Sequence, residues 1–114
     1  TVPTNARWRL LAWLTSLTAA VAVANREVEL VVDDGATVFA RTASGVSQTS
    51  LQVRTYTAFR GADRFTFNVA PTVALPLWDA VLMGGFRVRT ITSNLQAADD
   101  FSAPQLLVEE WIED

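Results

Sequence analysis

Apolar and polar residues alternate along much of the chain with the period of two that is typical of β-strands. The clearest case is the segment 27–32, EVELVV, in which acidic residues alternate with apolar ones. Asp33, Asp34 and Gly35 follow it and predict a hairpin turn, because an Asp-Gly pair tolerates positive φ. The segment Val38–Thr42 then predicts the return strand.

Four further segments alternate in the same way, and each predicts a strand. They are residues 50–59, 64–70, 86–92 and 104–113. In the second of them, Phe65, Phe67 and Val69 are expected to point inward. In the third, Phe86 and Val88 are expected to point inward, with arginines facing the other way.

The stretches between these strands are less regular. Pro71 and Pro76 bracket residues that are expected to be irregular, because proline cannot donate to a strand ladder. Residues 77–83 predict either a helical turn or a short strand. Gly84 and Gly85 predict a tight turn before the next strand.

The N-terminal segment is compatible with several interpretations. Arg7 and Arg9 precede an uncharged run from Leu10 to Ala24, which resembles a secretory signal sequence. Its fifteen residues are fewer than the roughly 18–20 that a transmembrane helix needs. The leucine spacing also fits a helix, but the β-rich remainder favours a long strand. Such a strand places Trp8 toward the core and Trp13 on the face of the two arginines.

These elements predict the fold class. About seven or eight strands are expected, at spacings near the 8–12 residues that are typical of a sandwich. No helical segments alternate with them, which argues against a parallel α/β sheet. A chain of 114 residues suits one domain with its own core. We therefore expect residues 1–114 to form a single all-β domain, an antiparallel β-sandwich with a jelly-roll-like topology.

Composition excludes several kinds of chemistry. The chain has no Cys and no His, which rules out disulfides, thiolate metal sites and the Ser-His-Asp and Cys-His arrangements. All nine basic residues are Arg, and the net charge is −3. Nucleic-acid binders usually carry a basic excess, so no nucleic-acid partner is expected. We also expect no cofactor, no metal and no membrane partner.

Adjacent acidic residues are the first candidates for a site. The Asp-Asp-Gly turn lacks the later Glu of a calcium-binding EF-hand loop, so the hairpin interpretation is favoured. Asp99 and Asp100 lack an Asp-x-Asp spacing and fit a polar loop between two strands, with a loop-bound calcium ion as the alternative. Glu109 and Glu110 are neighbours on a strand, so they should point to opposite faces and cannot act as an acid–base pair.

A second acidic row is open to two interpretations. Glu27 and Glu29 share one strand face, as two glycosidase carboxylates could. Arg87 and Arg89 have the same spacing on another strand. If the two strands are neighbours, a cross-strand Arg–Glu ladder is expected, and we favour it over catalysis.

Exposed tryptophan and arginine side chains are typical of the residues that dominate protein–protein interfaces. Six residues are therefore candidates for contacts with a partner protein: Arg7, Arg9, Trp13, Arg87, Arg89 and Trp111. Trp78 and Tyr56 are the alternative candidates, as platforms on which sugar rings could stack.

Three segments of the chain resemble a group of small tailed-bacteriophage proteins. They are VPTNARWRLLAWLTSLTAA at 2–20, ANREVELVVDDGATVFART at 24–42 and GGFRVRTITSNLQAADDFSAPQLLVEEW at 84–111. The shared features are a Trp-Arg opening strand, an Asn-Arg pair before the second strand, a Gly-Phe-Arg-x-Arg-Thr strand and a Leu-Val-Glu-Glu-Trp tail. The likeness is weakest over residues 44–82. It implies a virion-associated β-sandwich and brings no catalytic motif with it.

We therefore expect a non-enzymatic structural protein of a phage virion. The favoured role is a decoration or cement protein on the capsid exterior, bound to the major capsid protein and to its own copies. Such a protein is expected to be a homo-oligomer, with a trimer at a lattice junction as one arrangement. A neck or tail component and a carbohydrate-binding module of a tail fibre are the alternatives.

Overall fold

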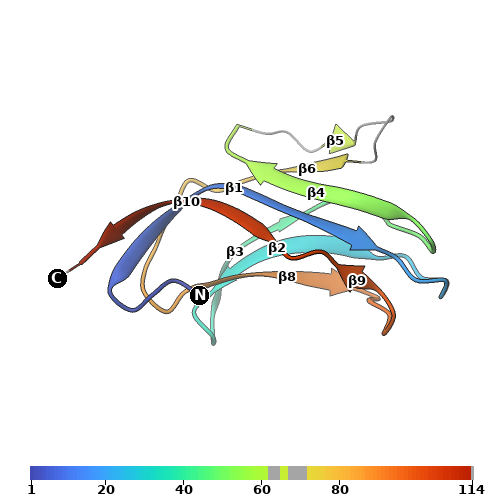
Figure 1. Ribbon diagram of the computed structural model, residues 1–114, viewed down its shortest axis with the longest axis horizontal. Helices are drawn as coiled ribbons and strands as arrows, with labels where there is room; N and C mark the ends of the chain where they lie inside the picture. Colours follow the sequence, from blue (N-terminus) through green and yellow to red (C-terminus); the bar gives the residue numbers. More distant parts are fainter. Residues whose placement is uncertain (62–64, 67–71, 114) are drawn as a thin grey trace.

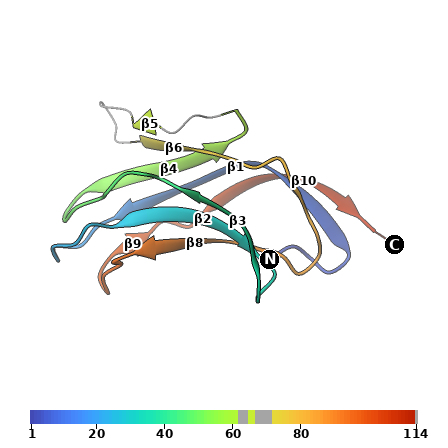
Figure 2. The same ribbon diagram turned by 180° about the vertical axis from the view of Figure 1, so that it is seen from behind.

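The computed structural model describes residues 1–61, 65–66 and 72–113. Over these residues the protein is all-β, with ten strands in two sheets that pack face to face (Figures 1 and 2). The strands are β1 (Ala6–Thr18), β2 (Glu27–Asp33), β3 (Val38–Ala43), β4 (Val53–Phe59), β5 (Phe65–Thr66), β6 (Thr72–Pro76), β7 (Val81–Leu82), β8 (Arg87–Ser93), β9 (Asp100–Phe101) and β10 (Gln105–Ile112). The predicted all-β sandwich is confirmed.

The two sheets are unequal in size. The larger has the order β10-β1-β4-β6-β5, with β7 and β9 also paired to β1, and the smaller has the order β3-β2-β8. All pairs are antiparallel except β4 and β6, which run parallel. The β1–β10 ribbon extends beyond the smaller sheet and carries the C terminus at its tip (Figure 1).

Strand β1 confirms the strand interpretation of the N-terminal segment and contains one irregularity. Its register with β10 shifts between Leu10 and Ala12, so Leu11 has no partner residue on β10. An extra residue of this kind is a β-bulge, and it inverts the alternation of side chains beyond it. The core-facing residues of β1 are therefore even-numbered up to Leu10 and odd-numbered from Trp13 onward.

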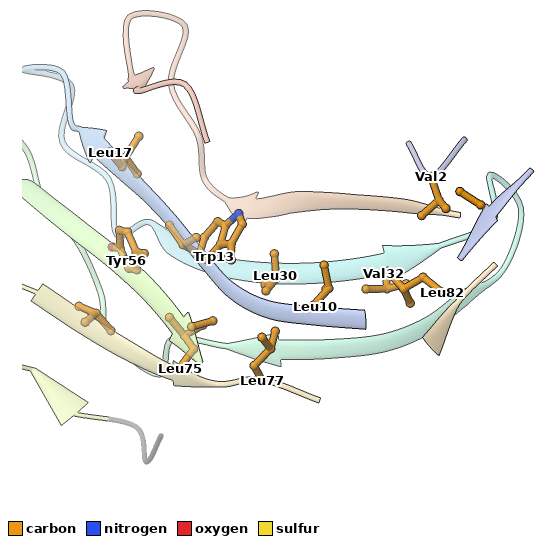
Figure 3. Close-up of a cluster of buried hydrophobic side chains, with 14 residues drawn as sticks. Val2, Leu10, Trp13, Leu17, Leu30, Val32, Tyr56, Leu75, Leu77 and Leu82 are labelled. Atoms are coloured by element: carbon orange, nitrogen blue, oxygen red, sulfur yellow. The ribbon is translucent and has the colours of Figure 1, made fainter. Parts of the chain in front are cut away.

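The core lies between the two sheets (Figure 3). Its largest contributors from the three central strands are Leu10, Trp13, Leu17, Leu30, Val32 and Tyr56. Full burial of one such side chain stabilises the fold by roughly 1.5–3 kcal/mol. The Tyr56 hydroxyl donates a 2.8 Å hydrogen bond to Gln48 Oε1, and burial raises the pKa of Tyr56 to about 12.

Two expectations about the middle of the chain need correction or fall outside the described residues. The stretch before Pro76 is not irregular, because β6 pairs with β4 on one side and β5 on the other, with proline only at its last position. Residues 77–83 contain the short strand β7 rather than a helical turn. Phe67 and Val69, predicted to point inward, lie outside the described residues.

Candidate functional site

The outer face of the β1–β10 ribbon brings three of the six candidate interface residues together. Arg7 lies opposite Trp111 in the strand register, and the Arg9 guanidinium lies over the Trp111 ring, 5.5 Å from its centroid. Together with Val81 and Glu113 they line a shallow hollow of about 360 Å³, which we call the Arg–Trp patch. Cation–π stacking of this kind holds an exposed aromatic ring in one orientation.

The cations of the Arg–Trp patch are paired within the chain. Arg7 Nε lies 2.6 Å from a Glu113 carboxylate oxygen. Asp79 lies 3.6 Å from Arg9 and 3.1 Å from Arg60. These pairs are exposed, so each contributes little to stability. Their effect is to present a tryptophan ring framed by charged groups of both signs.

Trp13 does not belong to this patch, and the expectation that its side chain is exposed on the face of Arg7 and Arg9 is wrong. Its side chain is only 2% exposed and packs in the core. The prediction assumed an unbroken alternation from Arg7 through Arg9 to Trp13. The bulge at Leu11 breaks that alternation and turns Trp13 inward.

Arg87 and Arg89 lie on the outer face of the smaller sheet, away from the Arg–Trp patch. Strands β2 and β8 are neighbours, as the ladder hypothesis required, but both arginines bind Asp33 rather than Glu27 or Glu29. The Arg87 Nε to Asp33 Oδ1 distance is 2.8 Å. Hydrogen bonds from Arg87 and then Arg89 hold the pKa of Asp33 well below its usual range. The two strands are neighbours, but the predicted Arg–Glu ladder is wrong, because both arginines converge on Asp33 instead.

Of the two other acids on that face, Glu29 has a partner of its own. Glu29 accepts a 2.8 Å hydrogen bond from Arg41 on β3. Glu27 and Glu29 line a hollow of about 290 Å³ with Arg41, Ile91 and Ser93. A carboxylate tied to arginine is poorly placed to act as a proton donor or nucleophile, so this geometry does not favour the glycosidase hypothesis.

The hairpin predicted at the Asp-Asp-Gly turn is present between β2 and β3. Besides the two arginines, Asp33 accepts a hydrogen bond from the Gly35 amide at 2.7 Å. Asp34 accepts from the amides of Ala36 and Thr37 at 2.9 and 2.7 Å. These amides lower the pKa of Asp34. Both carboxylates shape the turn, as the hairpin interpretation expected.

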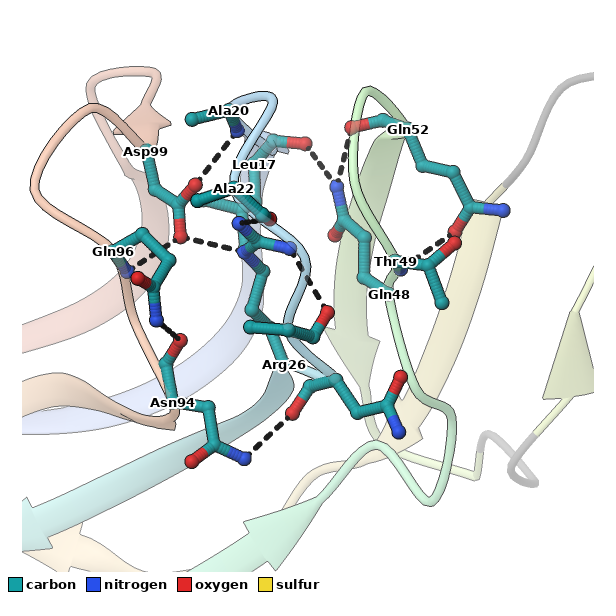
Figure 4. A network of polar contacts seen from close by, with 12 residues as sticks. Leu17, Ala20, Ala22, Arg26, Gln48, Thr49, Gln52, Asn94, Gln96 and Asp99 are labelled. Atoms are coloured by element: carbon teal, nitrogen blue, oxygen red, sulfur yellow. Dashed lines mark hydrogen bonds and ion pairs between the residues drawn. The ribbon is translucent and has the colours of Figure 1, made fainter.

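Asp99 is the acid that the sequence left most open, and it lies in a buried ion pair (Figure 4). Its Oδ2 lies 2.6 Å from Arg26 Nε, and both side chains are fully buried. It also accepts hydrogen bonds from the amides of Ala20 and Gln96, at 2.7 and 2.8 Å. Mainly because of Arg26, the pKa of Asp99 falls to about 2. With its oxygens occupied in this way, Asp99 acts as a structural anchor.

The arginine of this pair was missed by sequence reasoning. Arg26 also donates to the carbonyls of Ala24 and Ala22, at 3.0 and 2.9 Å, and so organises the loop that precedes β2. Its partner Asp99 is 73 positions away, so no local pattern pointed to the pair. The sequence marked Arg26 only as the end of a long uncharged segment and as part of the Asn-Arg pair before the second strand.

The other predicted side chains have clear positions. Glu109 and Glu110 point to opposite faces: Glu109 lies opposite Arg9, and Glu110 accepts a 2.6 Å hydrogen bond from the Trp8 indole. Tyr56 is buried, so its prediction as a sugar platform is wrong. Trp78 is partly buried against the core.

One further feature lies between the edges of the two sheets. Within the described residues, β8 and β10 each pair with one strand only, so their outer edges are unpaired. A cleft of about 290 Å³ opens between them. Its apolar lining includes Trp13, Val88, Phe101 and Leu106. We call the two edges and this cleft the open side of the sandwich.

The described part of the chain contains no group of three or more acidic side chains that could hold a metal ion. Over the same residues there is no helix long and apolar enough to cross a membrane. No family model, curated protein or solved structure matches the chain.

Proposed function

We propose that this protein is a non-enzymatic structural subunit of a tailed-phage virion. Its most economical role is to decorate the capsid exterior by binding the major capsid protein. The observation that carries the proposal is the open side, where two unpaired strand edges flank an apolar cleft. An unpaired edge offers a row of backbone donors and acceptors to a strand of another protein.

The side chains around the open side support a protein partner. Strand β10 exposes apolar groups on both of its faces, with Leu106 and Leu107 at 40% and 60% exposure. Trp111 lies further along the same strand in the Arg–Trp patch. Arg89 lies at the β8 edge and lines the cleft. Tryptophan and arginine next to apolar surface are the usual composition of an interface centre.

The charge distribution favours an outer position in a particle. The net charge is −3, and the arginines of the Arg–Trp patch are paired with acids of the same chain. Such a surface would be repelled by packaged DNA. The resemblance to small tailed-phage proteins points to the same setting.

The experiment that tests this function measures copy number and position in purified virions. Quantitative mass spectrometry against the major capsid protein, combined with antibody labelling in electron microscopy, is expected to find on the order of hundreds of copies on the shell. About a dozen copies or fewer would indicate a position in the neck or tail instead of the shell. Absence from purified virions would overturn the proposal.

A variant experiment tests the open side and the patch. Trp111→Ala should weaken binding to undecorated particles while leaving the thermal unfolding midpoint nearly unchanged, because its side chain is 40% exposed. Arg89→Ala should weaken binding as well, with a moderate decrease in the midpoint, because it removes one of the two arginines bound to the buried Asp33 carboxylate. Arg41→Ala is the matched control, since Arg41 is an exposed, paired arginine away from the cleft. If both test variants decorate particles normally, neither the open side nor the Arg–Trp patch is the surface that binds the particle.

A further inference from the structure

One end of the sandwich is formed by three loops that contain no exposed charged residue. They are residues 19–25, 44–52 and 94–98, and all 21 of these positions are uncharged. Figure 1 shows the corresponding connections, β1 to β2, β3 to β4 and β8 to β9, at the same end of the molecule. Arg26 and Asp99, which follow two of these loops, are buried and neutralise each other, and the nearest exposed charge is Asp100 at the start of β9. We call this end the neutral loop end.

Hydrogen bonds join the three loops into one surface (Figure 4). The Leu51 amide donates to the Ala20 carbonyl at 3.1 Å, and Asn94 Nδ2 donates to the Asn25 carbonyl at 2.9 Å. Asp99 adds its 2.7 Å hydrogen bond from the Ala20 amide. A surface held in this way loses little conformational entropy when it binds.

Large apolar side chains project from this joined surface into solvent. Val21 and Val23 are 74% and 94% exposed, and Leu51 and Leu95 are 70% and 49% exposed. Each of the three loops contributes at least one of them. Exposed apolar side chains from three hydrogen-bonded loops at one end of the molecule make this end a candidate interaction surface.

Leu51 is unfavourable for the isolated fold in two ways. Its φ is +62°, in the left-handed region where a bulky side chain is strained. It is the third residue of a turn closed by the Gln52 amide and the Thr49 carbonyl, a position at which glycine or asparagine is preferred. Glycine or asparagine at this position would make the isolated monomer more stable than leucine does. A leucine that is both strained and exposed indicates that its side chain acts outside the monomer.

We infer that two copies of this chain associate through their neutral loop ends. The molecule carries a net charge of −3, so copies repel one another weakly overall. The neutral loop end adds little to that repulsion, and an apolar surface is complementary to itself across a twofold axis. Membrane binding is less favoured, since these loops have none of the aromatic or basic residues that anchor proteins at a bilayer.

The test is sedimentation velocity on the whole chain from about 1 μM to about 1 mM, the range that covers weak to moderate association. The wild type is expected to form dimers. Val23→Asp should weaken dimer formation by about tenfold or more, because it places an unpaired carboxylate in the contact. Leu107→Asp is the matched control at 60% exposure on β10, and it should dimerise like the wild type.

Leu51→Gly distinguishes the role of Leu51 in dimer formation from its effect on the stability of the monomer. It should also weaken the dimer, while raising the thermal unfolding midpoint under conditions in which both proteins are monomeric, because glycine relieves the strain at positive φ. A wild type that stays monomeric throughout the range overturns the inference. So does a trimer, a dimer that survives both loop substitutions, or one that only Leu107→Asp dissociates. These outcomes do not depend on where the protein lies in a virion.

Discussion

Arg26 and Asp99 are the residues on which the loop architecture most depends. The arginine holds two carbonyls of its own loop and one carboxylate from the loop after β8. A charged pair in this setting is stable only because nearly every donor and acceptor is satisfied. Removal of one partner leaves the other charged and buried.

We therefore predict that Arg26→Met strongly destabilises the protein. The thermal unfolding midpoint should fall by about 10–20 °C, because Asp99 is left buried without its cation. The control is Arg41→Met, which removes a pair whose arginine is 54% exposed and should change the midpoint by only a few degrees. If the two substitutions lower the thermal unfolding midpoint by similar amounts, the buried pair contributes no more to stability than an exposed one.

Acid should destabilise the fold through Asp33 and Asp99. The pKa of Asp99 falls from an ordinary 3.8 to about 2 in the folded protein, and that of Asp33 is also lowered. The unfolded chain therefore binds protons first, and the free energy of unfolding decreases as pH falls from about 4 to about 2. Urea unfolding over a pH series should show this decrease. In Asp33→Asn the decrease should be smaller, and an unchanged slope would contradict the assignment.

At the scale of elements, the bulge in β1 determines which side chains form the core. Leu11 is the extra residue, and it lets Leu10 and Trp13 face inward although they are three positions apart. Deletion of Leu11 would leave these two residues at the spacing of a regular strand. We predict that the Leu11 deletion variant still folds, with a β-sheet circular dichroism spectrum and a cooperative thermal transition.

Deletion of Thr15 is the matched control for the bulge. It lies in the regular part of β1, between Trp13 and Leu17, which both face the core. Its removal would place one of these two side chains on the outer face, so the variant should fail to fold cooperatively. If both deletions had the same effect, the bulge would not determine which side chains of β1 face the core.

The elements also show where sequence patterns are informative. The segments with strict alternation, β2 and its hairpin partner β3, were predicted with their turn, because local chemistry decides all three. Strand β6 was missed because Pro71 and Pro76 predicted an irregular stretch between them. Pairing with β4, which no local pattern shows, holds these residues in a strand. Tyr56 was misassigned as an exposed sugar platform, because its hydrogen bond to Gln48 in the core forms only in the folded chain.

At the scale of the whole molecule, stability should be lowest along the open side. Among the residues that the structure describes, β1 and β2 have partners on both sides, whereas β10 is paired on its β1 side only. Hydrogen exchange should therefore be slowest in the centre of β1 and in β2, and much faster at the amides on the outer edge of β10. Addition of a partner that binds the open side should slow exchange in β10 selectively. Uniform protection across these strands would contradict this view.

The sequence by itself determined the fold class and the absence of histidine and cysteine chemistry, because period, turn residues and composition are local properties. Alternation also placed Arg7 and Arg9 on one strand face, but only the pairing of β1 with β10 brought Trp111 beside them. Only the tertiary structure decided that Trp13 lies in the core, that Asp33 pairs with two arginines and that Asp99 pairs with Arg26. Each of these depends on contacts across more than fifty positions or on a one-residue bulge, and no local pattern encodes either.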